Sequence, residues 1–174
     1  MLKKLTQNNI KEIILYNSIL LLSRNKLFYT KFNLTDTFQN RINLIFLHIS
    51  FIFIKIKQNN ENKKFKFFYQ KMFDLIFKKI ELNMREIGYG DTVINKNMKF
   101  LVITFYNILL NCENFNRKSV ILKKKFFSKY LEHNNKKKKA NKVHLIEYFE
   151  KYRAFCLDLT LDSVLKGELN FKYK

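Results

Sequence analysis

The chain contains almost no residues that interrupt a helix. Its 174 residues include no proline and three glycines. Proline breaks helices and glycine weakens them, so long helices meet few interruptions here. Clean alternation of apolar and polar residues, which indicates a half-buried strand, is rare. We therefore expect an all-α fold, in which residues 1–174 form a single-domain bundle of about six helices.

Apolar residues at helical spacing predict where these helices lie. Asp36 and Gln39 resemble a capping box at the start of the second helix. Residues 42–56 are apolar on all sides, which fits a central core helix, and this run is shorter than the roughly twenty residues that span a bilayer. The alternative is an exposed apolar surface that meets a membrane or an unfolded membrane protein. The predicted helices cover about residues 8–23, 36–57, 65–87, 93–113, 117–133 and 142–160.

Two of the three glycines, Gly88 and Gly90, lie between the third and fourth predicted helices. A glycine at position 88 can adopt the left-handed conformation that closes a helix end. Asp91 or Thr92 can then cap the next helix through a side-chain oxygen. These features predict a helical hairpin at the centre of the bundle, with a tight Gly-x-Gly corner.

The net charge is +20, and nearly all of it comes from lysine. Lys, Asn, Ile and Phe are all abundant, as an AT-rich genome would produce, so composition drift is one explanation. The other is a polyanionic partner, either ribosomal RNA or an anionic membrane face. The basic run at residues 136–139 is expected in an exposed loop.

No group of residues indicates catalysis or a metal site. The two cysteines, Cys112 and Cys156, form no disulfide framework and favour a reducing compartment. His48, His133 and His144 have no metal-ligand spacing, and phosphate-binding and nucleophile motifs are absent. The N-terminal apolar patch lacks a cleavage site of the signal-peptide type. We expect a protein that is not secreted, is not an enzyme and uses no cofactor or metal.

Four short blocks, in order along residues 16–174, resemble the ubiquinol–cytochrome c chaperone family. The third is the most specific, with Ile87 in place of the methionine that the family carries. In the second, Ile42 replaces a phenylalanine. The blocks are Ser23-Arg24…Phe28-Tyr29, Asp36-Thr37…Arg41…Leu47-His48, Arg85-Glu86-Ile87-Gly88-Tyr89-Gly90-Asp91, and Gly167…Leu169…Phe171.

This resemblance implies an assembly chaperone for respiratory complex III that binds newly made cytochrome b. It also implies a small co-chaperone and a position near the ribosomal exit tunnel. The expected location is cytoplasmic and peripheral, at the inner face of the respiratory membrane, or on the matrix side in an organelle. The short N-terminus resembles the bacterial form. No specific DNA binding is expected.

The polar residues of the matching blocks are the candidate client-binding residues, and each has a structural alternative. Asp36 and Asp91 can be helix caps, Arg85 and Glu86 can form ion pairs that fix the corner, and His48 fits a hydrogen-bonded core histidine. Phe105 and Tyr106 are expected in the core. We expect the second helix and the corner at residues 84–91 to border a groove for a hydrophobic client. The candidates are Tyr29, Asp36, Arg41, His48, Arg85, Glu86 and Asp91, with Gly88 and Gly90 as structural residues.

Two other functions remain open from the residues alone. The charge allows a basic helical protein associated with RNA or the ribosome, although aromatic and arginine contacts typical of RNA readers are few. A small structural subunit of a membrane complex, with its lysines buried against partners, is the other.

Overall fold

The computed structural model describes residues 10–58, 63–134 and 142–173. Within these ranges the chain is mostly α-helical, and β-type pairing is limited to one isolated bridge between Leu34 and His133. The predicted all-α fold is therefore confirmed. The elements in chain order are α2 (Ile10–Ser23), α3 (Leu27–Thr30), α4 (Phe38–Lys57), α5 (Lys63–Glu86), α6 (Asp91–Glu113), the 3-10 helix η1 (Phe115–Arg117), α7 (Val120–Tyr130), α8 (Lys142–Asp158) and α9 (Leu161–Lys166).

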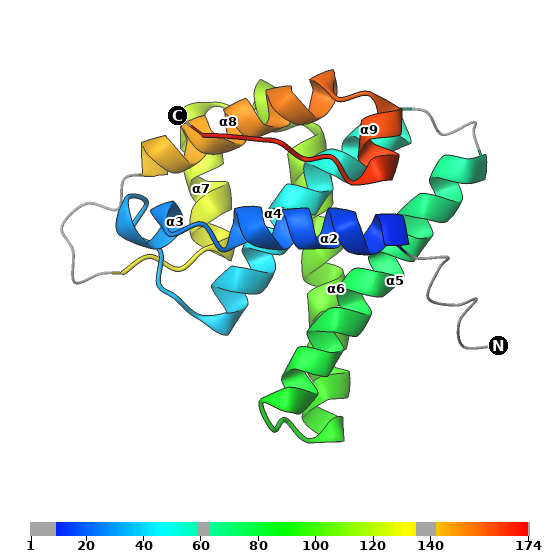
Figure 1. Ribbon diagram of the computed structural model, residues 1–174. Helices are drawn as coiled ribbons and strands as arrows, with labels where there is room; N and C mark the ends of the chain where they lie inside the picture. Colours follow the sequence, from blue (N-terminus) through cyan, green and yellow to red (C-terminus); the bar gives the residue numbers. More distant parts are fainter. Residues whose placement is uncertain (1–9, 59–62, 135–141, 174) are drawn as a thin grey trace.

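Helix α4 is the centre of the bundle. It packs against α2, α5, α6, α8 and α9, which surround it in Figure 1. Every residue from 42 to 53 is buried, including the polar Asn43, His48 and Ser50. The other helices cover all sides of α4, which explains why its sequence is apolar around the whole circumference. No helix in the described ranges has the length and apolarity to cross a membrane.

The start of α4 differs from the predicted capping box. Thr37 is the N-cap, and its Oγ1 accepts a hydrogen bond from the Asn40 amide at 3.2 Å. Asp36 lies one residue too early for this role and instead accepts hydrogen bonds from Arg41. Gln39 donates to the Asn43 side chain. The capping-box prediction was wrong because Thr37, not Asp36, is the last residue before the helical backbone begins.

The corner between α5 and α6 is a Schellman motif. Gly88 has φ +90°, its amide bonds to the Arg85 carbonyl at 3.0 Å, and the Tyr89 amide bonds to the Met84 carbonyl at 3.1 Å. The predicted left-handed role of Gly88 is confirmed. Gly90 is extended and forms the N-cap of α6 without a side-chain bond, so the prediction of Asp91 or Thr92 as cap was wrong. The corner lies at the far end of the long α5–α6 hairpin, beyond the other helices (Figure 1).

The predicted fifth helix is shorter than expected. Ser119 caps the start of α7, and the chain is extended from Leu131 onward. There the buried side chain of Asn40 donates to the carbonyls of Thr35 (2.7 Å) and Glu132 (2.8 Å) and accepts from the Glu132 amide (2.9 Å). The Asn40 side chain therefore holds the segment after α7 against the start of α4. The extended backbone of this segment explains why α7 ends before residue 133. The basic run at 136–139 lies outside the described residues.

The C-terminal segment returns along the bundle. Gly167, at φ +76°, ends α9, and residues 168–173 run without regular structure between α2 and α8 (Figure 1). A Cβ on Gly167 would lie 2.7 Å from Ile14 Cγ2 and 2.8 Å from the Leu15 amide nitrogen. The Ser18 hydroxyl donates to the Gly167 carbonyl. The final block of the family pattern therefore docks on α2, where only a glycine fits.

Both cysteines are buried and free. Cys112 lies on α6 and Cys156 on α8, and burial raises the pKa of each thiol. The thiols are therefore protonated and shielded from solvent, which fits the prediction that they form no disulfide framework.

Candidate functional site

Three of the four sequence blocks meet in one cleft between α2, α4 and α5. The cleft has a volume of about 200 Å³. The end of α2 contributes the first block, the start of α4 the second, and the last turns of α5 the third. We call this the motif cleft. Its lining residues are Tyr16, Leu20, Ser23, Arg24, Phe38, Arg41, Ile42, Ile45, Ile80, Asn83, Glu86 and Ile87.

The motif cleft has an apolar floor and a charged rim. Ile42, Ile45 and Ile80 are buried beneath it and belong to the hydrophobic core. Arg24, Arg41 and Glu86 are exposed around it, together with Ile87, whose side chain is 58% exposed. Such an arrangement can accept an apolar side chain at the floor and hold polar groups of either sign at the edge.

Arg41 and Asp36 form a bidentate pair at one side of the cleft. Arg41 Nε lies 2.7 Å from Asp36 Oδ1, and Nη2 lies 2.8 Å from Oδ2. The hydrogen bond from Arg41 lowers the pKa of Asp36. Burial, followed by the nearby Asp36 carboxylate, raises the pKa of Tyr29. The structure thus brings three predicted residues, Tyr29, Asp36 and Arg41, together next to the cleft.

Arg85 and Asp91 brace the hairpin corner. Arg85 donates to Asp91 at 2.5 Å and to Glu81 at 2.9 Å, so it links the end of α5 to the start of α6. Glu86, the next residue, points to the other side and lines the motif cleft. Arg85 thus forms ion pairs at the corner, as its structural alternative expected: one with Glu81, four residues earlier on the same helix face, and one with Asp91 across the turn.

His48 lies in the core, apart from the motif cleft. Its Nδ1 is 2.7 Å from the Leu44 carbonyl, so Nδ1 carries the proton and donates, and Nε2 accepts from the Tyr148 hydroxyl at 2.9 Å. Burial lowers the pKa of His48 to about 4. The structural interpretation of this histidine, as a hydrogen-bonded core residue, fits its surroundings.

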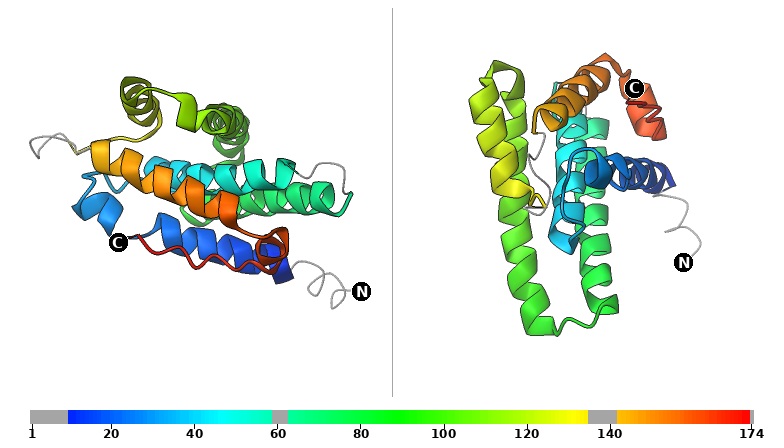
Figure 2. Two further views of the ribbon diagram at one scale, coloured as in Figure 1. Left: turned by 90° about the horizontal axis from the view of Figure 1, so that it is seen from above. Right: turned by 90° about the vertical axis from the view of Figure 1, so that its left-hand side faces the viewer.

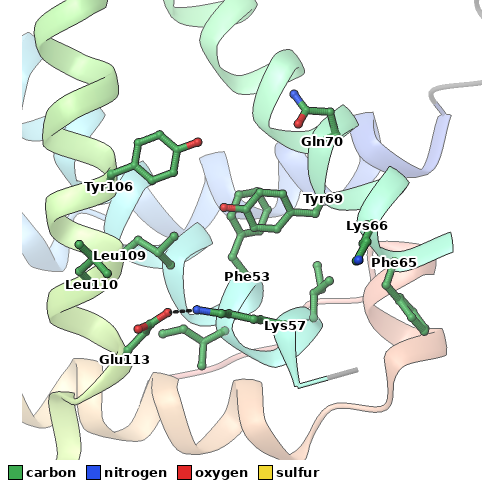
Figure 3. A pocket seen from close by; sticks show the side chains of 12 residues that line it. Phe53, Lys57, Phe65, Lys66, Tyr69, Gln70, Tyr106, Leu109, Leu110 and Glu113 are labelled. Atoms are coloured by element: carbon green, nitrogen blue, oxygen red, sulfur yellow. Dashed lines mark hydrogen bonds and ion pairs between the residues drawn. The ribbon is translucent and has the colours of Figure 1, made fainter. Parts of the chain in front are cut away.

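A second cavity, which sequence reasoning missed, lies between α4, α5 and α6 at the opposite end of the α4–α5 pair. Its volume is about 480 Å³, and aromatic and aliphatic side chains make up most of its wall (Figure 3). The pair of Lys57 and Glu113, at 2.7 Å, lies at its edge. We call it the apolar pocket. Its principal apolar lining residues are Phe53, Ile54, Ile56, Phe65, Tyr69, Tyr106, Leu109 and Leu110.

Tyr106 belongs to this pocket and not to the core. Phe105 is 1% exposed, as predicted, whereas Tyr106 is 45% exposed. Consecutive helical residues point about 100° apart, so both rarely face the same core. The sequence did contain a signal for this surface. Apolar residues on α6 cover more of the helix than its core-facing side, because Phe100, Ile103 and Leu110 lie outside that side.

Metal binding finds no support within the described ranges, where no cluster of three or more His, Cys, Asp or Glu side chains could hold an ion.

Comparison with known proteins adds a family and a fold. A family model described as ubiquinol-cytochrome C chaperone matches residues 30–170. Among solved structures, the chain is similar to the crystal structure of the Cbp3 homolog from Brucella abortus. The TM-score is 0.79 at 21% sequence identity, and the alignment covers 99% of this chain and 97% of that chain. At this identity the likeness establishes the fold. A search of curated protein sequences finds no significant match.

Proposed function

The chain belongs to the ubiquinol–cytochrome c chaperone family, whose model matches residues 30–170, and from this membership we propose that it is a non-catalytic assembly chaperone for respiratory complex III. Its client in this proposal is newly made cytochrome b. The match over most of the chain is the observation that carries the proposal. It agrees with the resemblance expected from the four sequence blocks.

The motif cleft is the proposed client site. It supports this role because residues far apart in the sequence converge there around an apolar floor. An unfolded membrane protein offers apolar side chains, and their burial drives association. Arg24, the Arg41–Asp36 pair and Glu86 then orient the client through polar contacts at the edge. In this proposal Arg85, Asp91, Gly88 and Gly90 hold the corner that positions Glu86 and Ile87.

The proposed setting follows from charge and from the family. We propose that the protein works at the inner face of the respiratory membrane, with a small co-chaperone, close to the ribosomal exit tunnel. The net charge of +20 supports contact with polyanionic surfaces of this kind.

A gene deletion tests the function directly. We expect the deletion strain to lose most of its assembled complex III and to accumulate little cytochrome b, as measured by haem spectra and native gels. Re-expression of the chain should restore both. Normal levels in the deletion strain would reject the proposal, and stoichiometric co-purification with mature complex III would indicate a structural subunit instead.

A pair of variants at the hairpin corner tests the site. Ile87→Asp places a charge at the mouth of the motif cleft, and we expect it to reduce capture of newly made cytochrome b severalfold. Val93→Asp is the matched control, because Val93 is similarly exposed but lies outside the cleft lining. Equal capture by both variants, with unchanged melting temperatures, would place the client elsewhere.

A further inference from the structure

Helices α6 and α7 form one side of the molecule. Both views in Figure 2 show them at one edge of the molecule, with the remaining helices all to one side of them. The chain reverses direction between them at η1. Lys118 Nζ fixes this reversal by donating to the Asn111 carbonyl (2.9 Å) and the Asn111 side-chain oxygen (2.6 Å).

The outer surface of this layer is unusually apolar for exposed helices. On α6, Ile103 and Leu110 are 61% and 60% exposed, and on α7, Ile121 is 67% exposed. The first turn of α7 presents three consecutive apolar side chains to solvent. Water contact of this extent on neighbouring helices marks a surface that meets another apolar phase. Leu110 also borders the apolar pocket, and Phe100 and Ile103 border a cleft between α4, α6 and α7. The exposed apolar residues of the layer include Phe100, Ile103, Leu110, Val120, Ile121 and Leu122.

Positive charge accompanies these apolar side chains. Residues 114–131 contain six basic residues and no acidic one. The two acidic residues of α6 are already neutralised, Asp91 by Arg85 and Glu113 by Lys57. The layer therefore carries a positive charge that its own carboxylates do not balance, and only one of its lysines, Lys123, is paired with a carboxylate of α8, that of Glu150. The six basic residues are Arg117, Lys118, Lys123, Lys124, Lys125 and Lys129.

The core holds this surface rigidly in place. Phe126, Phe127 and Tyr130 form the buried face of α7, and the Phe127 ring stacks on Phe149 of α8 with centroids 5.3 Å apart. Lys123, on the same inner face, pairs with Glu150 at 2.7 Å. The opposite face of α7 is therefore left to Ile121 and Lys125, with Lys124 and Lys129 at its sides.

We propose that the outer surface of α6 and α7 docks on an anionic lipid bilayer. A bilayer supplies negative headgroups and hydrocarbon together at every point of its surface, which matches exposed apolar residues interspersed with lysines. RNA supplies the anions but offers no apolar phase for Ile121 and its neighbours. In this orientation the first turn of α7 enters the interface, and Lys124, Lys125 and Lys129 contact headgroups.

The docking surface is separate from the motif cleft, which is lined by α2, α4 and α5. The proposal therefore goes beyond the chaperone function and can be tested on the purified chain without a client. The probes are two kinds of vesicle. One contains only neutral phosphatidylcholine, and in the other about one lipid in three is an anionic phospholipid.

Tryptophan fluorescence reports which part of the chain enters the lipid. The sequence contains no tryptophan, so a single introduced one is an unambiguous probe. We expect the emission of Ile121→Trp to shift to the blue with anionic vesicles and to remain unchanged with neutral vesicles. Leu21→Trp on α2 is the control, because Leu21 is 76% exposed but lies outside the layer. A shift for Leu21→Trp alone would overturn the proposal.

Charge reversal tests the lysines. Each basic side chain near an anionic surface contributes roughly fivefold to affinity, so Lys124→Glu with Lys125→Glu should weaken vesicle binding at least about 20-fold. Lys78→Glu with Lys79→Glu changes the net charge equally, at exposed positions on α5, and should weaken binding much less. An equal loss in both double variants would show diffuse attraction and overturn the proposal. So would binding of a single-stranded RNA that depends on Lys124 and Lys125 while anionic vesicles fail to bind.

Discussion

At the scale of single residues, the three glycines occupy three different backbone environments. Gly88 is left-handed with open space around its Cα, Gly90 is extended, and Gly167 is left-handed and pressed against α2. A left-handed backbone costs any other residue roughly 1–2 kcal/mol, whereas an extended one costs nothing. The conformation, and not the Gly-x-Gly pattern itself, therefore sets how much each glycine matters.

Alanine substitutions should separate these environments. We expect Gly88→Ala to lower the free energy of unfolding by about 1 kcal/mol and Gly90→Ala to change it by only a few tenths. Gly167→Ala should cost more than Gly88→Ala, because its Cβ would also collide with the Leu15 backbone. Urea unfolding followed by circular dichroism gives the three values. Equal losses at positions 88 and 90 would contradict the assigned conformations.

His48 should make stability depend on pH in a defined window. In the unfolded chain the His48 side chain has a pKa of about 6.5, and in the folded chain burial lowers this pKa to about 4. Between these values the unfolded state holds more protons, so stability falls as pH decreases, by on the order of 3 kcal/mol in total. His48→Gln removes the titrating group, and we expect its stability to fall less between pH 6.5 and 4. Parallel curves for the two proteins would exclude His48 as the source.

At the scale of elements, Asn40 joins parts of the chain that no helix connects. Its buried side chain satisfies backbone groups of Thr35 and Glu132, and the neighbouring Asn43 donates to the Tyr130 carbonyl at 2.6 Å. These two asparagines hold the end of α7 against the start of α4. They replace the helical hydrogen bonds that end when the backbone becomes extended at Leu131.

Removal of this tether should loosen α7 more than the rest. We expect Asn40→Ala to cost about 2–4 kcal/mol, since it leaves buried backbone groups unpaired. Hydrogen exchange should accelerate at the Glu132 amide before it does so in α4. The control is Asn95→Ala on the exposed side of α6, which should change stability by less than about 0.5 kcal/mol.

The long, strongly patterned elements could be predicted from sequence, and the junctions could not. The bounds of α5 and α6 and the left-handed Gly88 follow from local periodicity and turn chemistry. The cap at Thr37 differs from the predicted one by a single residue, a shift in where the helical backbone begins. The end of α7 depends on the side chain of Asn40, whose partners lie five residues back and more than ninety residues ahead. The convergence of Arg24, Arg41 and Glu86 likewise required the packing of α2 on α4 and α5. Contacts between residues so far apart in the sequence produce no repeating pattern of apolar residues, so they cannot be predicted from a single sequence.

At the scale of the whole molecule, the net charge of +20 opposes the compact state. The ion pairs are mostly exposed, and exposed pairs contribute little individually, so we expect repulsion among lysines to outweigh them. The fold is therefore stabilised by its apolar core, which runs through every helix from α2 to α9.

Added salt should raise the melting temperature. The screening length falls from about 30 Å at 0.01 M to about 10 Å at 0.1 M, which weakens repulsion between distant lysines more than attraction within close pairs. We expect a rise of a few degrees between 0.01 M and 0.15 M NaCl, measured by calorimetry. A fall over this range would mean that the ion pairs dominate.

Cys112 and Cys156 are the two cysteines of the sequence, and both lie sealed in the interior, on different helices. A thiol reagent in solution can reach them only when the surrounding helices separate. The rate of colour development with such a reagent therefore counts opening events of the native bundle, without any engineered label. A bound client that stabilises the bundle would lower this reaction rate, and the dependence of the rate on client concentration would give the client's affinity.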